Sequence, residues 1–85
     1  MRRRYFFHVK RGQVTILDQE GVELADIREA AREAARRGWE IAAHEALNGA
    51  PAGAGKIIID DEWCTVLELP LQDIVDDRLP KVQPR

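Results

Sequence analysis

The sequence predicts an α+β domain, in which one long amphipathic helix packs on one face of a small antiparallel sheet. An aromatic run with strand-like alternation opens the chain, an alanine-rich segment with helical spacing follows, and two β-favouring runs come after it. The expected order is therefore ββαββ. The chain has 85 residues, enough for one domain, which we place at residues 1–75 and follow with a mobile tail at residues 76–85.

The first hairpin is expected at the start of the chain. In the strand predicted at residues 4–10, alternate side chains share a face of the sheet. One face carries Tyr5, Phe7 and Val9, and the other carries Phe6, His8 and Lys10. Gly12 supplies the turn, and residues 14–17 form an antiparallel second strand. The acids and glycine at residues 18–21 end it, because these residues favour turns over strands.

The helix is predicted at residues 27–47, a segment without proline and rich in alanine. Asp26 is the expected N-cap, with Glu29 completing a capping box, and Asn48-Gly49 is the expected end. Gly38 is expected to let the helix lie close to the sheet. The apolar face is expected to comprise Ile27, Ala31, Ala34, Ala35, Trp39, Ala42 and Ala46. On the wet face, opposite charges four residues apart predict the ion pairs Glu33–Arg37 and Arg36–Glu40.

The second hairpin is predicted from two β-favouring runs after the helix. Residues 56–60 form the third strand, the acids at residues 60–62 form its turn, and residues 63–69 form the fourth strand. Pro70 ends this strand, because proline cannot donate to a strand ladder. Residues 71–75 are expected to add a last helical turn.

Both faces of the expected sheet carry apolar side chains, and one helix covers only one face. Large exposed apolar patches are uncommon on monomers, so the other face is expected to meet the C-terminal segment, a second copy or an unidentified protein partner. Homodimerisation is preferred for so short a chain. If the helix covers the face of Tyr5 and Phe7, the candidate interface residues are Phe6, His8, Ile58 and Val66. If the helix covers the other face, the set inverts.

Charge and cysteine content give limited information about the partners and the compartment of the protein. The net charge is −2, which by itself indicates neither a nucleic-acid binder nor a membrane binder. A single cysteine provides no disulfide framework, so a reducing cytoplasm is expected. The arginines at residues 2–4 are not followed by the apolar run of a secretory signal. No apolar stretch approaches the roughly 20 residues of a membrane-spanning helix.

Three patterns resemble reactive or ligand-binding sites, but none has the residues and spacing that such a site requires. Residues 53–56 (Gly-Ala-Gly-Lys) resemble part of a phosphate loop, but Ala50 and Ile57 break the motif, and the segment leads from a helix into a strand. Cys64 and the two histidines, His8 and His44, fit no zinc spacing. Cys64 is expected in mid-strand, as a buried and inert thiol. The acids at residues 60–62 lack the spacing of a calcium loop. The expected protein is therefore a non-enzyme without a cofactor or a metal.

The basic start of the chain supports an alternative, which is nucleic-acid binding. The cations are Arg2, Arg3, Arg4, Lys10 and Arg11, and they lie next to the aromatic run Tyr5-Phe6-Phe7. Cations and aromatic rings on a strand can hold phosphates and stack bases. Against this, residues 57–77 contain seven acids and no lysine or arginine, so the two regions are expected to neutralise each other if the hairpins lie close together.

The sequence also resembles a known family. The segments that carry the resemblance are Arg4-Tyr5-Phe6-Phe7-His8-Val9, the run at residues 18–24, the alanine-rich segment at residues 30–34, and Leu69-Pro70-Leu71. Together they resemble a family of short uncharacterised bacterial proteins, a domain-of-unknown-function group frequent in rhizobia and their relatives, over residues 3–75. The resemblance implies a fold and a bacterial origin, and no functional residue. Relatives usually have a glycine in the last hairpin turn, near Glu62-Trp63, so Trp63 is added as a candidate contact residue. The ββαββ order also resembles small antitoxin domains at the level of the fold.

Overall fold

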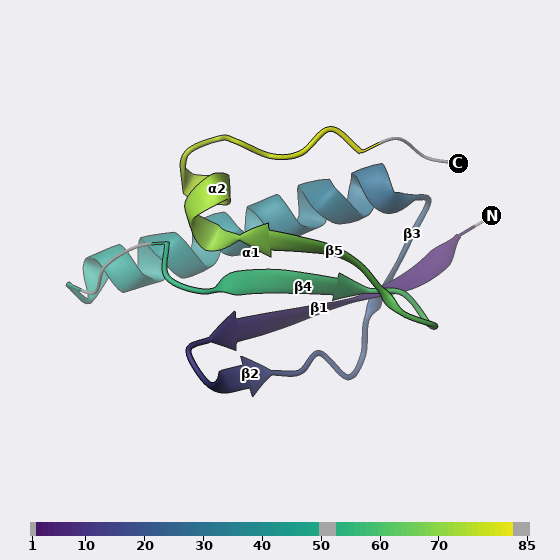
Figure 1. The fold of residues 1–85 in the computed structure, drawn as a ribbon, viewed down its shortest axis with the longest axis horizontal. Helices are drawn as coiled ribbons and strands as arrows, with labels where there is room; N and C mark the ends of the chain where they lie inside the picture. Colours follow the sequence, from purple (N-terminus) through teal and green to yellow (C-terminus); the bar gives the residue numbers. More distant parts are fainter. Residues whose placement is uncertain (1, 50–52, 83–85) are drawn as a thin grey trace.

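The computed structural model describes residues 2–49 and 53–82 and confirms the α+β class (Figure 1). Within these residues the elements are β1 (Arg3–Arg11), β2 (Val14–Ile16), β3 (Val22–Leu24), α1 (Ile27–Leu47), β4 (Lys56–Asp60), β5 (Thr65–Pro70) and α2 (Leu71–Val75). The expected ββαββ order is confirmed except for one missed strand, β3. The helical turn expected at residues 71–75 is α2.

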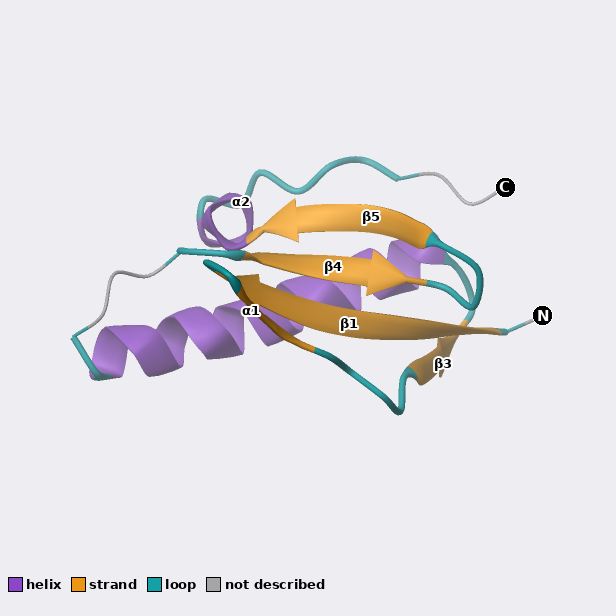
Figure 2. Cartoon of the chain, turned by 60° about the horizontal axis from the view of Figure 1, so that its bottom comes forward, coloured by secondary structure: helices purple, strands orange, loops and turns teal. Residues whose placement is uncertain are grey.

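The sheet is antiparallel, with the strand order β2-β1-β4-β5. β1 and β4 join the two hairpins, and their register places Phe7 beside Ile59 and Val9 beside Ile57. β3 pairs with the beginning of β1, where Tyr5 lies beside Val22. β2 and β3 therefore follow the same long strand in succession, and the loop at residues 17–21 separates them (Figure 2).

The ends of α1 form as the sequence predicts. The Asp26 carboxylate accepts a hydrogen bond from the Glu29 backbone N–H at 3.0 Å, and the Ala25 backbone N–H donates to the Glu29 carboxylate at 2.6 Å. The first bond satisfies a donor that the first turn of a helix leaves without a partner. The second is one residue away from the predicted capping box, because Glu29 accepts from the residue before the N-cap and not from Asp26 itself. At the other end, Gly49 takes a φ of 73°, which glycine adopts without strain.

Helix α1 lies across one face of the sheet (Figure 2). Tyr5 and Phe7 of β1 are buried and belong to the core cluster with residues of α1, so this is the face that carries them. This arrangement settles the open alternative, and Phe6, His8 and Ile58 consequently lie on the uncovered face. The buried core cluster comprises Tyr5, Phe7, Ala30, Ala34, Ile57, Ile59, Leu69, Leu71 and Ile74.

Helix α2 packs beside α1 and changes which residues of α1 are buried. A Cβ atom built on Gly38 would lie 2.5 Å from Ile74 Cδ1, so Gly38 makes room for α2 rather than for the sheet. The prediction that Trp39 and Ala46 lie on the buried face is wrong, because both are exposed. Helical periodicity shows which residues share a face, but it does not show where a second helix will dock.

The second hairpin differs from its predicted form at the turn. β5 begins at Thr65, so Trp63 and Cys64 lie in the turn and not in the strand. The Asp61 carboxylate accepts backbone hydrogen bonds from Trp63 at 2.7 Å and from Cys64 at 2.8 Å, and these bonds close the turn. The expected buried thiol is therefore wrong, because Cys64 is exposed.

The C-terminal segment runs back along α1 after α2 (Figure 1). Leu79, in this segment, is partly buried against the core cluster. The division into a domain at residues 1–75 and a mobile tail at residues 76–85 stays a prediction. Residues 83–85 of that tail lie outside the described part of the chain.

Candidate functional site at the β2 edge of the sheet

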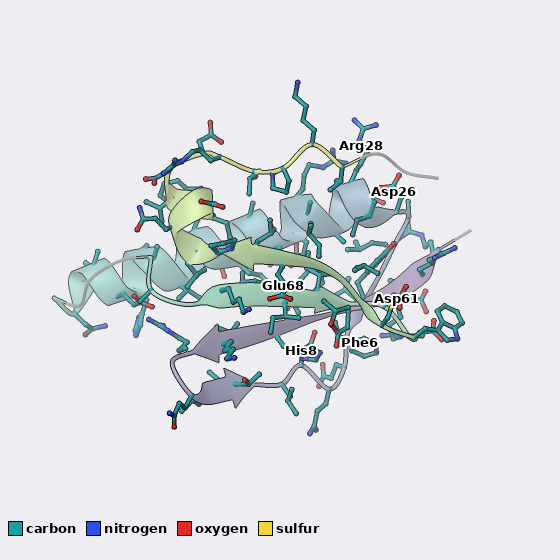
Figure 3. The ribbon with its side chains drawn as sticks, in the orientation of Figure 1. Phe6, His8, Asp26, Arg28, Asp61 and Glu68 are labelled. Carbon is teal, nitrogen blue, oxygen red and sulfur yellow. The ribbon has the colours of Figure 1, made fainter. Side chains whose placement is uncertain are left out.

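His8 lies on the uncovered face (Figure 3). Both of its ring nitrogens are engaged in hydrogen bonds. The Asp18 backbone N–H donates to His8 Nδ1 at 3.1 Å, so Nδ1 carries no proton. Nε2 therefore carries the proton, and its N–H donates a hydrogen bond to the Asp60 carboxylate at 3.0 Å. With no free ring nitrogen, this histidine holds two segments together and does not offer a general base.

Asp18 bridges the gap between β2 and β3. Its carboxylate accepts the backbone N–H of Phe7 at 3.1 Å, at the place where a continuous neighbouring strand would have offered a carbonyl. It also accepts the backbone N–H groups of Glu20 and Gly21, both at 3.1 Å. Burial acts to raise the pKa of the Asp18 carboxyl, but these hydrogen bonds, together with the Arg37 charge, hold its pKa below the ordinary value. One side chain thus fixes the path of the loop that begins directly after β2.

Arg37 ties this loop to α1. Its guanidinium lies 4.5 Å from the centre of the Phe7 ring and 3.8 Å from the Asp18 carboxylate. Glu33 accepts a hydrogen bond from Arg37 at 2.7 Å and also pairs with Arg36. Hydrogen bonds from the Arg36 side chain lower the pKa of the Glu33 carboxyl to about 2, although burial opposes this shift. The predicted pairs Glu33–Arg37 and Arg36–Glu40 are confirmed.

The low pKa of Glu33 makes the domain sensitive to acid. A carboxyl whose pKa is lowered on folding stabilises the fold above its unfolded pKa, and this stabilisation is lost as pH falls toward the folded value. We therefore expect the free energy of unfolding to decline between about pH 4.5 and pH 2, as measured by urea titration at successive pH values. In Glu33→Gln the decline should be shallower. An equally steep decline in that variant would contradict a role for Glu33.

β2 forms an edge of the sheet with large apolar side chains in the open. Val14, Ile16 and the adjoining Leu17 are 63%, 61% and 63% exposed. In the described part of the chain, no strand pairs with the outer side of β2. Exposed strand edges are usually protected by charged residues or proline, and the segment at residues 13–17 (Gln-Val-Thr-Ile-Leu) has neither.

The hairpin turn determines which backbone groups of β2 face outward. Arg11 pairs with Val14 across the two turn residues, of which Gly12 has a φ of 62°. In a two-residue hairpin the closing pair is hydrogen-bonded, and the next pair along is not. The next pair is Lys10 with Thr15. The N–H and C=O of Thr15 therefore point away from β1, free to pair with another strand.

The candidate interface residues predicted from the sequence fall into different surroundings. Phe6, His8 and Ile58 lie on the uncovered face but are only partly exposed. This face also carries the His8–Asp60 hydrogen bond and the Lys56–Glu68 ion pair, so it is a mixed apolar and polar surface. Val66 packs against the core, and Trp63 is 78% exposed in the turn before β5. We did not predict from the sequence that residues 14–17 form an exposed apolar edge. The pattern of three large apolar residues around a single threonine could have indicated it.

The five cations of the nucleic-acid alternative do not form one surface. Arg4 pairs with Glu23 at 3.1 Å, Arg2 donates to the backbone carbonyl of the same residue at 3.3 Å, and Arg11 pairs with Glu45. Arg3 and Lys10 are seven residues apart on β1, which is about 23 Å, and their side chains point to opposite faces.

The other reactive side chains are likewise dispersed. In residues 2–49 and 53–82, no three histidine, cysteine, aspartate or glutamate side chains gather as a metal site would require. His44 is exposed on α1, as predicted. Neither helix in the described residues has the length and apolar character needed to span a bilayer.

In the residues that the structure describes, the fold and this edge define a small α+β domain with a sheet that is open on one side and unprotected at β2. The chain belongs to the family described as a domain of unknown function, DUF6894, whose model matches residues 4–72. The resemblance to a family of unknown function, seen in the sequence, is thereby confirmed. No curated protein and no solved structure matches the chain.

Proposed function

We propose that this domain is a non-catalytic protein-interaction module that works as a homodimer, with β2 of one copy pairing with β2 of a second copy. The observation that carries the proposal is the unprotected edge, where Val14, Ile16 and Leu17 are each more than 60% exposed. Pairing at this edge would extend the antiparallel sheet across two copies and remove both unprotected edges.

The sequence of β2 is suited to pairing with itself. Because the Thr15 N–H and C=O point outward, a two-fold axis at Thr15 would let the two threonines exchange both backbone hydrogen bonds. In that register Val14 lies beside Ile16 of the partner subunit, in a non-hydrogen-bonded pair whose side chains approach closely. The two-fold axis produces two equivalent pairs of Val14 with Ile16, and both lie on the face of the sheet that carries Val9 and Arg11. Apolar β-branched pairs of this kind stabilise neighbouring strands.

Charge supports a second copy as the occupant of the edge. No lysine, arginine, aspartate or glutamate lies within residues 13–17, so self-pairing brings no like charges together. The single Thr15 in the centre is neutral, and its hydroxyl tolerates a copy of itself across the axis. A charged partner would find no complementary group on this strand.

Two edge variants and one matched control test the dimer by solution mass. Thr15→Pro removes the outward N–H and no bond to β1, and Ile16→Lys places a charge in the apolar pair. We expect a mass of twice 9.7 kDa for the unchanged chain and 9.7 kDa for both variants. Leu47→Lys changes an apolar residue that is 88% exposed at the end of α1, and it should leave the dimer intact.

The outcomes separate the edge from other dimer surfaces. A monomeric unchanged chain would overturn homodimerisation. A dimer that persists in Ile16→Lys, with folding verified by circular dichroism, would overturn the β2 edge and return attention to Phe6, Ile58 and Trp63. The lysine variant keeps the test decisive even if Thr15→Pro fails to fold.

A further inference from the structure

A cavity between α1 and the C-terminal segment gathers positive charge. It has a volume of about 450 Å³ and is lined by Arg28, Ala31, Arg32, Leu79, Pro80, Lys81 and Val82. Arg28 and Arg32 lie one turn apart on α1, and Lys81 comes from the segment that runs back over the helix. Figure 3 shows Arg28 near the beginning of α1, beside this segment.

These three cations lack acidic partners among the described residues. The ion pairs in that part of the chain engage Arg4, Arg11, Arg36, Arg37, Lys56 and Arg78. Arg28, Arg32 and Lys81 are in none of them. The nearby acids of the first turn, Asp26 and Glu29, accept backbone N–H groups as helix caps.

Within the described residues, two other arginines of α1 are paired with acids, unlike Arg28 and Arg32. Further along the helix, Arg36 is balanced by Glu33 and Glu40, and Arg37 by Glu33. At the cavity, Arg28 and Arg32 are like charges four residues apart, an arrangement that destabilises an isolated helix. An anion bound between them would remove this repulsion, and two guanidinium groups are well suited to oxygens of a tetrahedral or planar oxyanion.

We infer that this cavity binds a phosphomonoester with a small apolar substituent. The dianionic phosphate matches the charge of Arg28, Arg32 and Lys81 better than a single carboxylate does. The apolar wall formed by Ala31, Leu79 and Val82 would receive the substituent. This site is separate from the β2 edge.

Phenyl phosphate is the probe for this site, and binding is followed by the backbone amide NMR signals of Ala31, Leu79 and Val82. We expect saturable shifts that weaken as salt is added. The double variant Arg28→Ala/Arg32→Ala should raise the dissociation constant at least about tenfold. Inorganic phosphate should bind more weakly than phenyl phosphate, and acetate more weakly still.

Lys10→Ala is the matched control, because Lys10 is an exposed cation without an ion pair among the described residues and lies outside the cavity. It should leave the dissociation constant within about twofold of that of the unchanged chain. Equal loss of binding in Lys10→Ala would reduce the effect to net charge and overturn the site. Absence of saturable shifts with phenyl phosphate would also overturn it. Acetate binding as tightly as phenyl phosphate would overturn the assignment to phosphomonoesters.

Discussion

Replacing Gly55 with alanine should lower the free energy of unfolding by about 3 kcal/mol or more. Gly55 has a φ of 96°, which side chains of L-residues rarely adopt. A Cβ atom at this position would also collide with the backbone carbonyl oxygen of Lys10, on the neighbouring strand. The Gly55 carbonyl meanwhile accepts the Leu71 backbone N–H at 3.0 Å, so the loop cannot move away without losing the start of α2.

Two other glycines provide matched controls for Gly55. Gly12 and Gly49 have φ values of 62° and 73°, yet a Cβ atom on either would meet nothing within 4 Å. Gly12→Ala and Gly49→Ala should therefore cost only the backbone strain, about 1 kcal/mol each. Urea unfolding of the three variants measures the difference. If Gly55→Ala is no less stable than Gly12→Ala, the close approach between the Gly55 loop and β1 is wrong.

The second large effect is expected at Asp18. Asp18→Ala removes the acceptor for three backbone N–H groups and leaves the Phe7 N–H, in the middle of β1, without a partner. It also removes the carboxylate that faces Arg37. We expect a loss of about 3 kcal/mol in the free energy of unfolding, because an unsatisfied, partly buried donor retains its full desolvation cost. Chemical denaturation gives this value directly.

Asp61 is the control for Asp18, because its carboxylate also accepts backbone N–H groups, those of Trp63 and Cys64, but in an exposed turn. Asp61→Ala should cost about 1 kcal/mol, since water can replace the lost acceptor. Asp18→Asn keeps one side-chain oxygen and should fall between the two alanine variants. If Asp18→Ala lowers the free energy of unfolding by no more than Asp61→Ala does, the Asp18 carboxylate does not bridge β2 and β3.

Local signals in the sequence were sufficient for most elements of the fold. The cap residues Asp26 and Gly49 defined the two ends of α1, and the isoleucine run defined β4 with the bounds that the structure has. β3 was missed because its three residues are too few for a periodic pattern, and a side chain, Asp18, determines where the strand resumes. The turn before β5 was misplaced because Trp63 favours strands by type, whereas the Asp61 carboxylate closes the turn around it.

The candidate sites depended on arrangements that sequence spacing does not show. The sequence showed that both faces of the sheet carry apolar side chains, and we therefore expected an exposed apolar surface on the face without the helix. In the structure, Phe6 and Ile58 on that face are only partly exposed. The most exposed apolar side chains of the sheet instead lie at the β2 edge, in Val14, Ile16 and the adjoining Leu17, because no further strand follows β2 on that side in the described residues. The cavity of Arg28, Arg32 and Lys81 joins residues about 50 positions apart, and only the path of the C-terminal segment brings them together.

Amide hydrogen exchange at Thr15, measured over a range of protein concentrations, tests the proposed dimer most directly. In a single copy the Thr15 N–H points outward and should exchange rapidly, whereas pairing with a second β2 should protect it. We predict that protection of Thr15 rises with concentration in parallel with the dimer mass. Rapid exchange of Thr15 at concentrations where the protein is dimeric, or no dimer at any concentration, would contradict the pairing of β2 with itself.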